Sequence, residues 1–171
     1  MANLIIEDGI EVLTMGENLF SDCPLKSLYL GRNLSYYNQK SGNSPFHDKS
    51  TLTDVTIGSS VTSIGNYAFS NCTALANLII EDGIEVLTMG KILFSDCPLK
   101  SLYLGRNLSY STDQESGYSP FCGKSTLTEV IIGNSVTNIG DYALAYCSDL
   151  TGITIPSTVT SIGYKAFSDC I

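Results

Sequence analysis

"LTDVTIGSSVTSIGNYAFSNCTA" occupies residues 52–74, and it decides the fold because its pattern returns along the chain. At residues 54–57, apolar side chains alternate with polar ones, which predicts a short strand with one face inward. Val61 and Ile64 predict a second apolar contact after a turn. The apolar residues within 68–72 suit one tight, 3₁₀-like turn rather than a long helix. Such a coil cannot bury its own apolar edge, so it must stack on copies of itself.

Those copies are present. Residues 127–149 and 150–171 repeat the pattern nearly throughout, and residues 2–36 match residues 76–110 at all but two positions. We therefore divide the chain into coils 1 to 7, which start near Met1, Leu25, Leu52, Leu75, Leu99, Leu127 and Leu150. A period of about 20–30 residues is the signature of a solenoid.

The shared pattern L-x-x-[VI]-x-I-x-x-x-V-x-x-I-G-x-x-A-F-x-x-C resembles the BspA-like, treponemal-type leucine-rich repeat. Coils 3, 6 and 7 match it closely, and coils 1 and 4 carry two extra residues in the turn. Coils 2 and 5 depart most, because the polar segments 36–49 and 110–125 replace the IGxxAFxxC part.

The resemblance implies a repeat solenoid, a leucine-rich-repeat array of about seven coils. We expect a parallel β-sheet on one face, with short second strands, turns and 3₁₀ segments on the other. Residues 1–171 would form a single domain, with Phe46 and Phe121 filling the core below the long segments. Met1 opens within a repeat, so we expect the chain to be a piece of a longer protein.

Charge argues against several classes of partner. The chain has 9 Lys and Arg against 17 Asp and Glu, for a net charge of −8. Affinity for nucleic acid and for anionic lipid depends on a basic surplus, which is missing here. No apolar run approaches the roughly 18 residues needed to cross a bilayer. We therefore expect no nucleic-acid partner and no membrane insertion.

No catalytic, cofactor-binding or metal-binding constellation appears, so we expect no enzyme activity. The single His47 has no second His, and no C-x-x-C pair exists. Five cysteines share one column of the repeat, where they suit small buried side chains; they are Cys23, Cys72, Cys97, Cys147 and Cys170. The sequence leaves open whether a disulfide joins Cys72 to Cys97, or Cys147 to Cys170. The acidic pairs Glu7-Asp8 and Glu81-Asp82 follow the strands of coils 1 and 4, and we expect them to lie on a solvent-exposed flank.

One column of strand residues points away from the core and is the candidate partner-binding face. This outward column consists of Ile5, Tyr29, Thr56, Ile79, Tyr103, Ile131 and Thr154. Its isoleucines and tyrosines suit an interaction surface, since exposed apolar patches often mark such sites. They equally suit cross-strand stabilisation of the sheet. Segments 36–49 and 110–125 are further candidates, because loops on a rigid scaffold often carry function.

The family resemblance implies surface-exposed or secreted proteins that adhere to host proteins and to other cells. We therefore predict a non-enzymatic protein- or glycan-binding scaffold, part of a cell-surface or secreted adhesin. Its partner would be an extracellular or host protein or glycan. The alternative is a structural spacer, or an array that self-associates through uncapped ends, because solenoids normally need polar caps.

Overall fold

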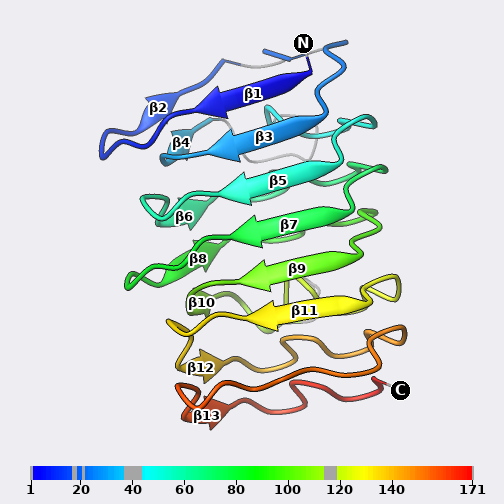
Figure 1. The fold of residues 1–171 in the computed structure, drawn as a ribbon. Helices are drawn as coiled ribbons and strands as arrows, with labels where there is room; N and C mark the ends of the chain where they lie inside the picture. The colour runs from blue at the N-terminus through cyan, green and yellow to red at the C-terminus, as the bar shows by residue number, and fades with distance from the viewer. Residues whose placement is uncertain (1, 17–18, 21, 37–43, 114–118, 171) are drawn as a thin grey trace.

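The computed structural model describes residues 2–16, 19–20, 22–36, 44–113 and 119–170. The coils stack along one axis, with the first coil at one end and the last at the other (Figure 1). In the described residues, one long parallel sheet runs along the stack in the order β1-β3-β5-β7-β9-β11. Its strands are β1 (Asn3–Ile6), β3 (Ser27–Leu30), β5 (Asp54–Ile57), β7 (Asn77–Ile80), β9 (Ser101–Leu104) and β11 (Glu129–Ile132).

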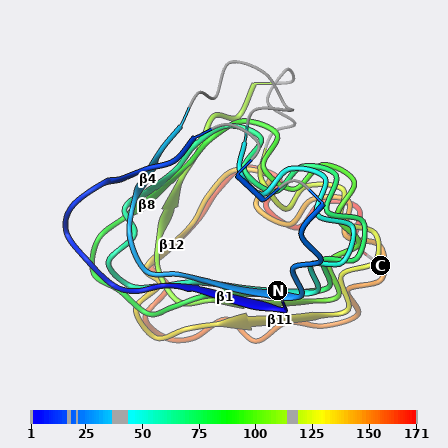
Figure 2. The same cartoon turned by 90° about the horizontal axis from the view of Figure 1, so that it is seen from above.

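Shorter second strands form another side of the solenoid, and they also pair in parallel with their neighbours. They are β2 (Leu13–Thr14), β4 (Leu34–Ser35), β6 (Ser63–Ile64), β8 (Leu87–Met89), β10 (Leu108–Ser109), β12 (Asn138–Ile139) and β13 (Ser161–Ile162). Seen along the axis, the sheet, the second strands and the turn segments enclose the core on three sides (Figure 2). The parallel sheet and the short second strands confirm the expected solenoid.

Aromatic rings run through the core as a continuous stack. Neighbouring rings of Phe20, Phe46, Phe69, Phe94 and Phe121 lie 5.6–5.8 Å apart between centroids and are close to parallel. Phe46 and Phe121 are fully buried, which confirms that the divergent coils 2 and 5 still supply a core phenylalanine. Each of coils 1 to 5 therefore adds one ring to a shared core, and the buried Leu144 takes this place in coil 6. Such a core is expected for an array stabilised by its neighbours.

A second column beside the rings satisfies backbone carbonyls. The thiols of Cys72 and Cys97 donate to the carbonyl oxygens of Phe46 and Phe69 one coil earlier, both at 3.1 Å. The ammonium of Lys124 takes the same position in coil 5 and donates to the carbonyl of Phe94 at 2.5 Å. All six cysteines are free thiols. Three members of the cysteine column, Cys72, Cys97 and Cys147, are thus buried as expected, whereas Cys23 and Cys170 are half-buried. The column also acts as a row of hydrogen-bond donors.

The segments after the second strands are successive turns rather than 3₁₀ helix in the described residues. They contain residues of positive φ four positions apart, such as Tyr67 with Asn71 and Tyr142 with Tyr146. A left-handed residue interrupts the uniform negative φ that a 3₁₀ run needs. In coils 3, 4, 6 and 7 the chain therefore turns twice without forming a helix.

The long sheet ends at β11, one coil before the end of the sequence. In coils 2 to 6, the residue after the strand donates its N–H to the previous strand, as Gly133 does to the carbonyl of Leu104 at 2.8 Å. Pro156 holds this position in coil 7 and has no N–H to donate. Residues 152–155 consequently form no strand, although β12 and β13 still pair on the neighbouring side.

Candidate functional site

The strand register places six residues of the outward column side by side. Ile5 pairs with Tyr29, Tyr29 with Thr56, and the alignment continues through Ile79 and Tyr103 to Ile131. The remaining member, Thr154, is exposed but lies outside the sheet, because residues 152–155 form no strand. The column is thus a real feature of one sheet face, and its role in binding stays a prediction.

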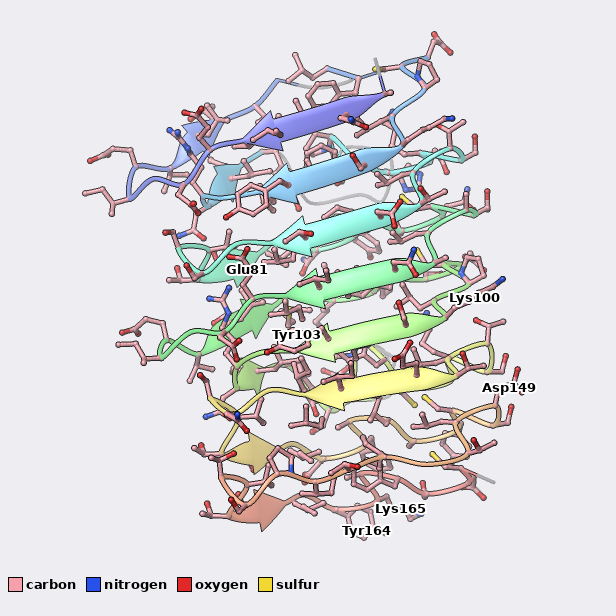
Figure 3. All side chains as sticks on the ribbon, viewed as in Figure 1. Glu81, Lys100, Tyr103, Asp149, Tyr164 and Lys165 are labelled. Atoms are coloured by element: carbon pink, nitrogen blue, oxygen red, sulfur yellow. The ribbon has the colours of Figure 1, made fainter. Side chains whose placement is uncertain are left out.

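The members of this column differ in exposure. Ile5, Ile79 and Ile131 are exposed, whereas Tyr29 and Tyr103 are half-buried. Ile79, Tyr103 and Ile131 lie on adjacent strands and form a continuous apolar row. Figure 3 shows Tyr103 on this face of the sheet.

Carboxylates hold both tyrosine hydroxyls at the carboxyl ends of the strands. The hydroxyl of Tyr29 lies 3.1 Å from both carboxylate oxygens of Asp8 and 3.5 Å from Oε2 of Glu81. The hydroxyl of Tyr103 donates to Oδ2 of Asp82 at 2.7 Å. Burial, followed by the hydrogen bond to Asp8, raises the pKa of Tyr29 to about 12. These tyrosines therefore fasten neighbouring coils together, which supports the stabilising role considered for them.

Glycines make room for these tyrosines. A methyl group at Gly58 would lie 2.7 Å from the hydroxyl oxygen of Tyr29, and one at Gly133 would lie 2.9 Å from that of Tyr103. Both contacts are too close for a real side chain. The glycine at each of these two positions is thus required by the tyrosine of the preceding coil, and not by its own backbone angle.

Two protruding loops carry apolar side chains that the strand pattern did not reveal. They follow β1 and β7 and have the same sequence, DGIEV, at residues 8–12 and 82–86. Ile10 is 92% exposed and Ile84 is 96% exposed. The signal in the sequence is the two extra residues of coils 1 and 4, which push these isoleucines out of the stacked positions. Figure 1 shows both loops projecting beyond the ends of the strands.

The edge that bears these loops is acidic. Exposed carboxylates of the loops and their flanks line it; they are Glu7, Asp8, Glu11, Asp82 and Glu85. Glu81 lies beyond the end of β7, and Lys100 lies at the opposite end of the strands (Figure 3). The two arginines of this edge, Arg32 and Arg106, donate to backbone carbonyls. A partner at this edge therefore meets apolar tips surrounded by negative charge.

A groove of about 670 Å³ lies on the sheet face between β11 and coil 7. Glu129, Ile131, Gly152 and Thr154 are among its lining residues. The groove exists because residues 152–155 do not pair with β11. It continues the outward column past the last paired strand.

Within the described ranges, no three His, Cys, Asp or Glu side chains are grouped as a metal site would need. In the same part of the chain, no helix is long and apolar enough to cross a membrane. Much of the candidate segments 36–49 and 110–125 lies outside the described residues, namely 37–43 and 114–118. The described remainder supplies the buried Ser44 and Ser119, whose hydroxyls donate to the carbonyls of Ala68 and Ala143 at 2.7 Å.

Comparison with known proteins gives a consistent result. The model of the BspA type leucine-rich repeat region matches residues 39–171 in six copies. A leucine-rich repeat protein from Bacteroides ovatus ATCC 8483 is similar in structure, with a TM-score of 0.56 and 16% identity over 98% of this chain. This chain covers only 43% of that protein. The T. pallidum leucine-rich repeat protein gives a TM-score of 0.44 and 20% identity, over 94% of this chain and 78% of that one. No curated protein matches the sequence.

The stacked parallel strands, the repeated core columns and the absence of helix in the described residues define a leucine-rich-repeat solenoid. The chain belongs to the family with the BspA type leucine-rich repeat region, which matches most of its length. This family supports a protein-interaction scaffold and is often surface-associated or secreted. Solenoids of this class are typically non-enzymatic and bind partners through extended surfaces.

Proposed function

We propose that the protein is a binding scaffold of a cell-surface or secreted adhesin, and that it recognises an extracellular or host protein or glycan. The observation that carries the proposal is the row of exposed isoleucines on the sheet together with the loop tips Ile10 and Ile84. Monomeric proteins rarely expose contiguous apolar patches unless these serve binding. The repeat family supports an interaction role, and the adhesin context comes from the family resemblance.

The duplicated surface suits a repetitive or extended partner. Ile10 and Ile84 are three coils apart, which corresponds to about 14 Å at the usual strand spacing. Linking two equivalent contacts raises affinity without any new kind of contact. A partner that presents apolar groups at that spacing would engage both loops at once.

The charge of the edge narrows the chemistry of the partner. Carboxylates surround the apolar tips, so a partner with Lys or Arg beside its apolar groups gains complementary charge. A sulfated glycan would be repelled by the same carboxylates. A basic, partly apolar protein surface is therefore the favoured partner, ahead of an anionic glycan.

Biolayer interferometry against purified extracellular-matrix proteins and glycans tests the proposal. We expect Ile10→Ser with Ile84→Ser, or Ile79→Ser with Ile131→Ser, to weaken binding by about tenfold or more, as for the loss of central apolar contacts. Tyr146→Ser is the matched control, because Tyr146 is exposed on a turn segment away from the sheet. Binding that survives both double variants, or no binding to any panel member, would count against the proposal.

A further inference from the structure

The edge of β11 that faces coil 7 carries backbone groups without a bonding partner in the described chain. Alternate residues of a parallel strand direct their N–H and C=O groups to opposite neighbours. Gly133 donates its N–H to Leu104 on the β9 side. Val130 and Ile132 therefore direct their N–H and C=O groups toward coil 7, where β11 pairs with no strand of the described residues.

An internal junction shows which bonds are missing at this edge. Between coils 3 and 4, the N–H of Asn77 donates to the carbonyl of Thr53 at 3.1 Å. The equivalent groups of coils 7 and 6 are the N–H of Gly152 and the carbonyl of Thr128, and they form no bond with each other. The sheet therefore stops at β11 although the next coil is present beside it.

The groove of about 670 Å³ between β11 and residues 152–156 lies along this edge. At roughly 30 Å³ for each water molecule, it has room for about 20 of them. A methyl group at Gly152 would meet no atom within 4 Å, so this wall is not crowded. Because β12 and β13 remain paired, coils 6 and 7 separate on the sheet side alone. Both walls belong to coils of this chain, and the groove does not require a free chain end.

Unpaired negative charge lies at the amino-terminal end of the groove. Glu129 begins β11 and lines the groove, and the exposed Asp149 lies just before coil 7. Figure 3 shows Asp149 on this side of the strands, opposite to Glu81. Within the described part of the chain, neither Glu129 nor Asp149 forms an ion pair. An occupant with Lys or Arg at this end would gain complementary charge.

We propose that this groove binds an extended, basic peptide segment of a partner protein, which adds to the sheet as the strand that coil 7 does not supply. Strand addition to an open sheet edge gives affinity through main-chain hydrogen bonds. The segment would bond the backbone groups of Val130 and Ile132. Its outward side chains would pack beside Ile131, where β-branched residues pair well across strands. A Lys or Arg of the segment would lie near Glu129.

This groove is a second site, separate from the loop tips Ile10 and Ile84. A segment of alternating side chains suits it better than a glycan does, because a peptide repeats its N–H and C=O groups at the spacing of the strand. The inference goes beyond the proposed function and does not depend on the identity of the partner sought there. Failure of the test below would leave the interferometry result for the loop tips unchanged.

Fluorescence anisotropy with a short, capped, labelled peptide tests the groove. The peptide alternates valine and threonine and carries arginine at both ends, and it should bind the chain saturably. Gly152→Leu fills the groove and should weaken binding by about tenfold or more. Glu129→Gln should weaken it by up to about fivefold, as for the loss of one exposed ion pair.

Gly16→Leu is the matched control, because a methyl group at Gly16 of coil 1 also meets no atom within 4 Å. This variant should bind the peptide as the wild type does. Circular dichroism matching the wild type shows that both leucine variants fold. Absence of saturable binding, or equal binding by folded Gly152→Leu, would overturn the proposal.

Hydrogen exchange measured by NMR separates strand pairing from side-chain contact alone. Saturating peptide should slow exchange of the Val130 and Ile132 amides by about tenfold or more, because these N–H groups then have acceptors. The amide of Gly133 is the reference, since it already bonds the carbonyl of Leu104. Bound peptide with unchanged exchange at Val130 and Ile132 would show that the segment does not add to the sheet.

Discussion

At the scale of single residues, the duplicated arginines show how position in the array changes the energetic role of one side chain. Arg106 is buried and satisfies three carbonyls of the turn after β5. Arg32 is half-buried and donates to one carbonyl among the described residues. The contribution of this arginine to stability therefore depends on whether a turn two coils earlier offers carbonyls to its guanidinium, although the local sequence is the same.

This contrast gives a stability prediction. Arg106→Ala leaves buried carbonyls without donors and should lower the free energy of unfolding by about 3 kcal/mol. Arg32→Ala should cost less than about 1 kcal/mol, as is usual for residues with few buried contacts. Urea unfolding of the two variants measures the difference in the free energy of unfolding. Equal decreases in the free energy of unfolding would show that the bonds of Arg106 to the turn after β5 do not stabilise the array.

At the scale of elements, Pro156 explains where the sheet stops. The N–H of Gly133 bonds the strand before it, and Pro156 has no equivalent group. In Pro156→Gly, the new amide at position 156 should bond the carbonyl of Ile132 and resist hydrogen exchange. Exchange measured by NMR, with the amide of Gly133 as the internal reference, reports this directly. An amide that exchanges at the free-peptide rate would mean that another feature keeps coil 7 from the sheet.

The elements also show what the sequence could and could not predict. Strict alternation in strands such as Asn77–Ile80 determines register, since a one-residue slip would turn the core residues outward. The outward column followed from that alternation. The loop tip Ile84 was missed because it lies outside any period. Lys124 was missed because its ammonium replaces a thiol as a donor, and this equivalence appears only once Phe94 and its carbonyl are placed.

At the scale of the whole molecule, buried phenols make stability depend on alkaline pH. Burial raises the pKa of Tyr29 and of Tyr36 to about 12, above the usual tyrosine value of 10.0. Between these values the unfolded chain loses the phenolic protons while the folded chain keeps them. The unfolded state then binds fewer protons, so the free energy of unfolding falls as pH rises from about 10 to 12.

Thermal unfolding measured between about pH 8 and pH 12, in steps of about one pH unit, checks this fall in stability. The melting temperature should be steady below pH 10 and should fall above it. Tyr36→Phe removes one of the phenols with a raised pKa, which also include Tyr103 and Tyr110, and should make the fall shallower. A melting temperature that stays level through pH 11 would contradict the burial of these hydroxyls.

The central claim is that the array presents its apolar sheet row and loop tips to a partner. Hydroxyl-radical footprinting of the chain, alone and with a partner found by interferometry, tests it most directly because it reports side-chain access to solvent. The account predicts that oxidation of Ile79, Ile84 and Ile131 falls on binding, while oxidation of Tyr146 on the turn side stays the same. Protection of Tyr146 with unchanged oxidation of the three isoleucines would contradict it.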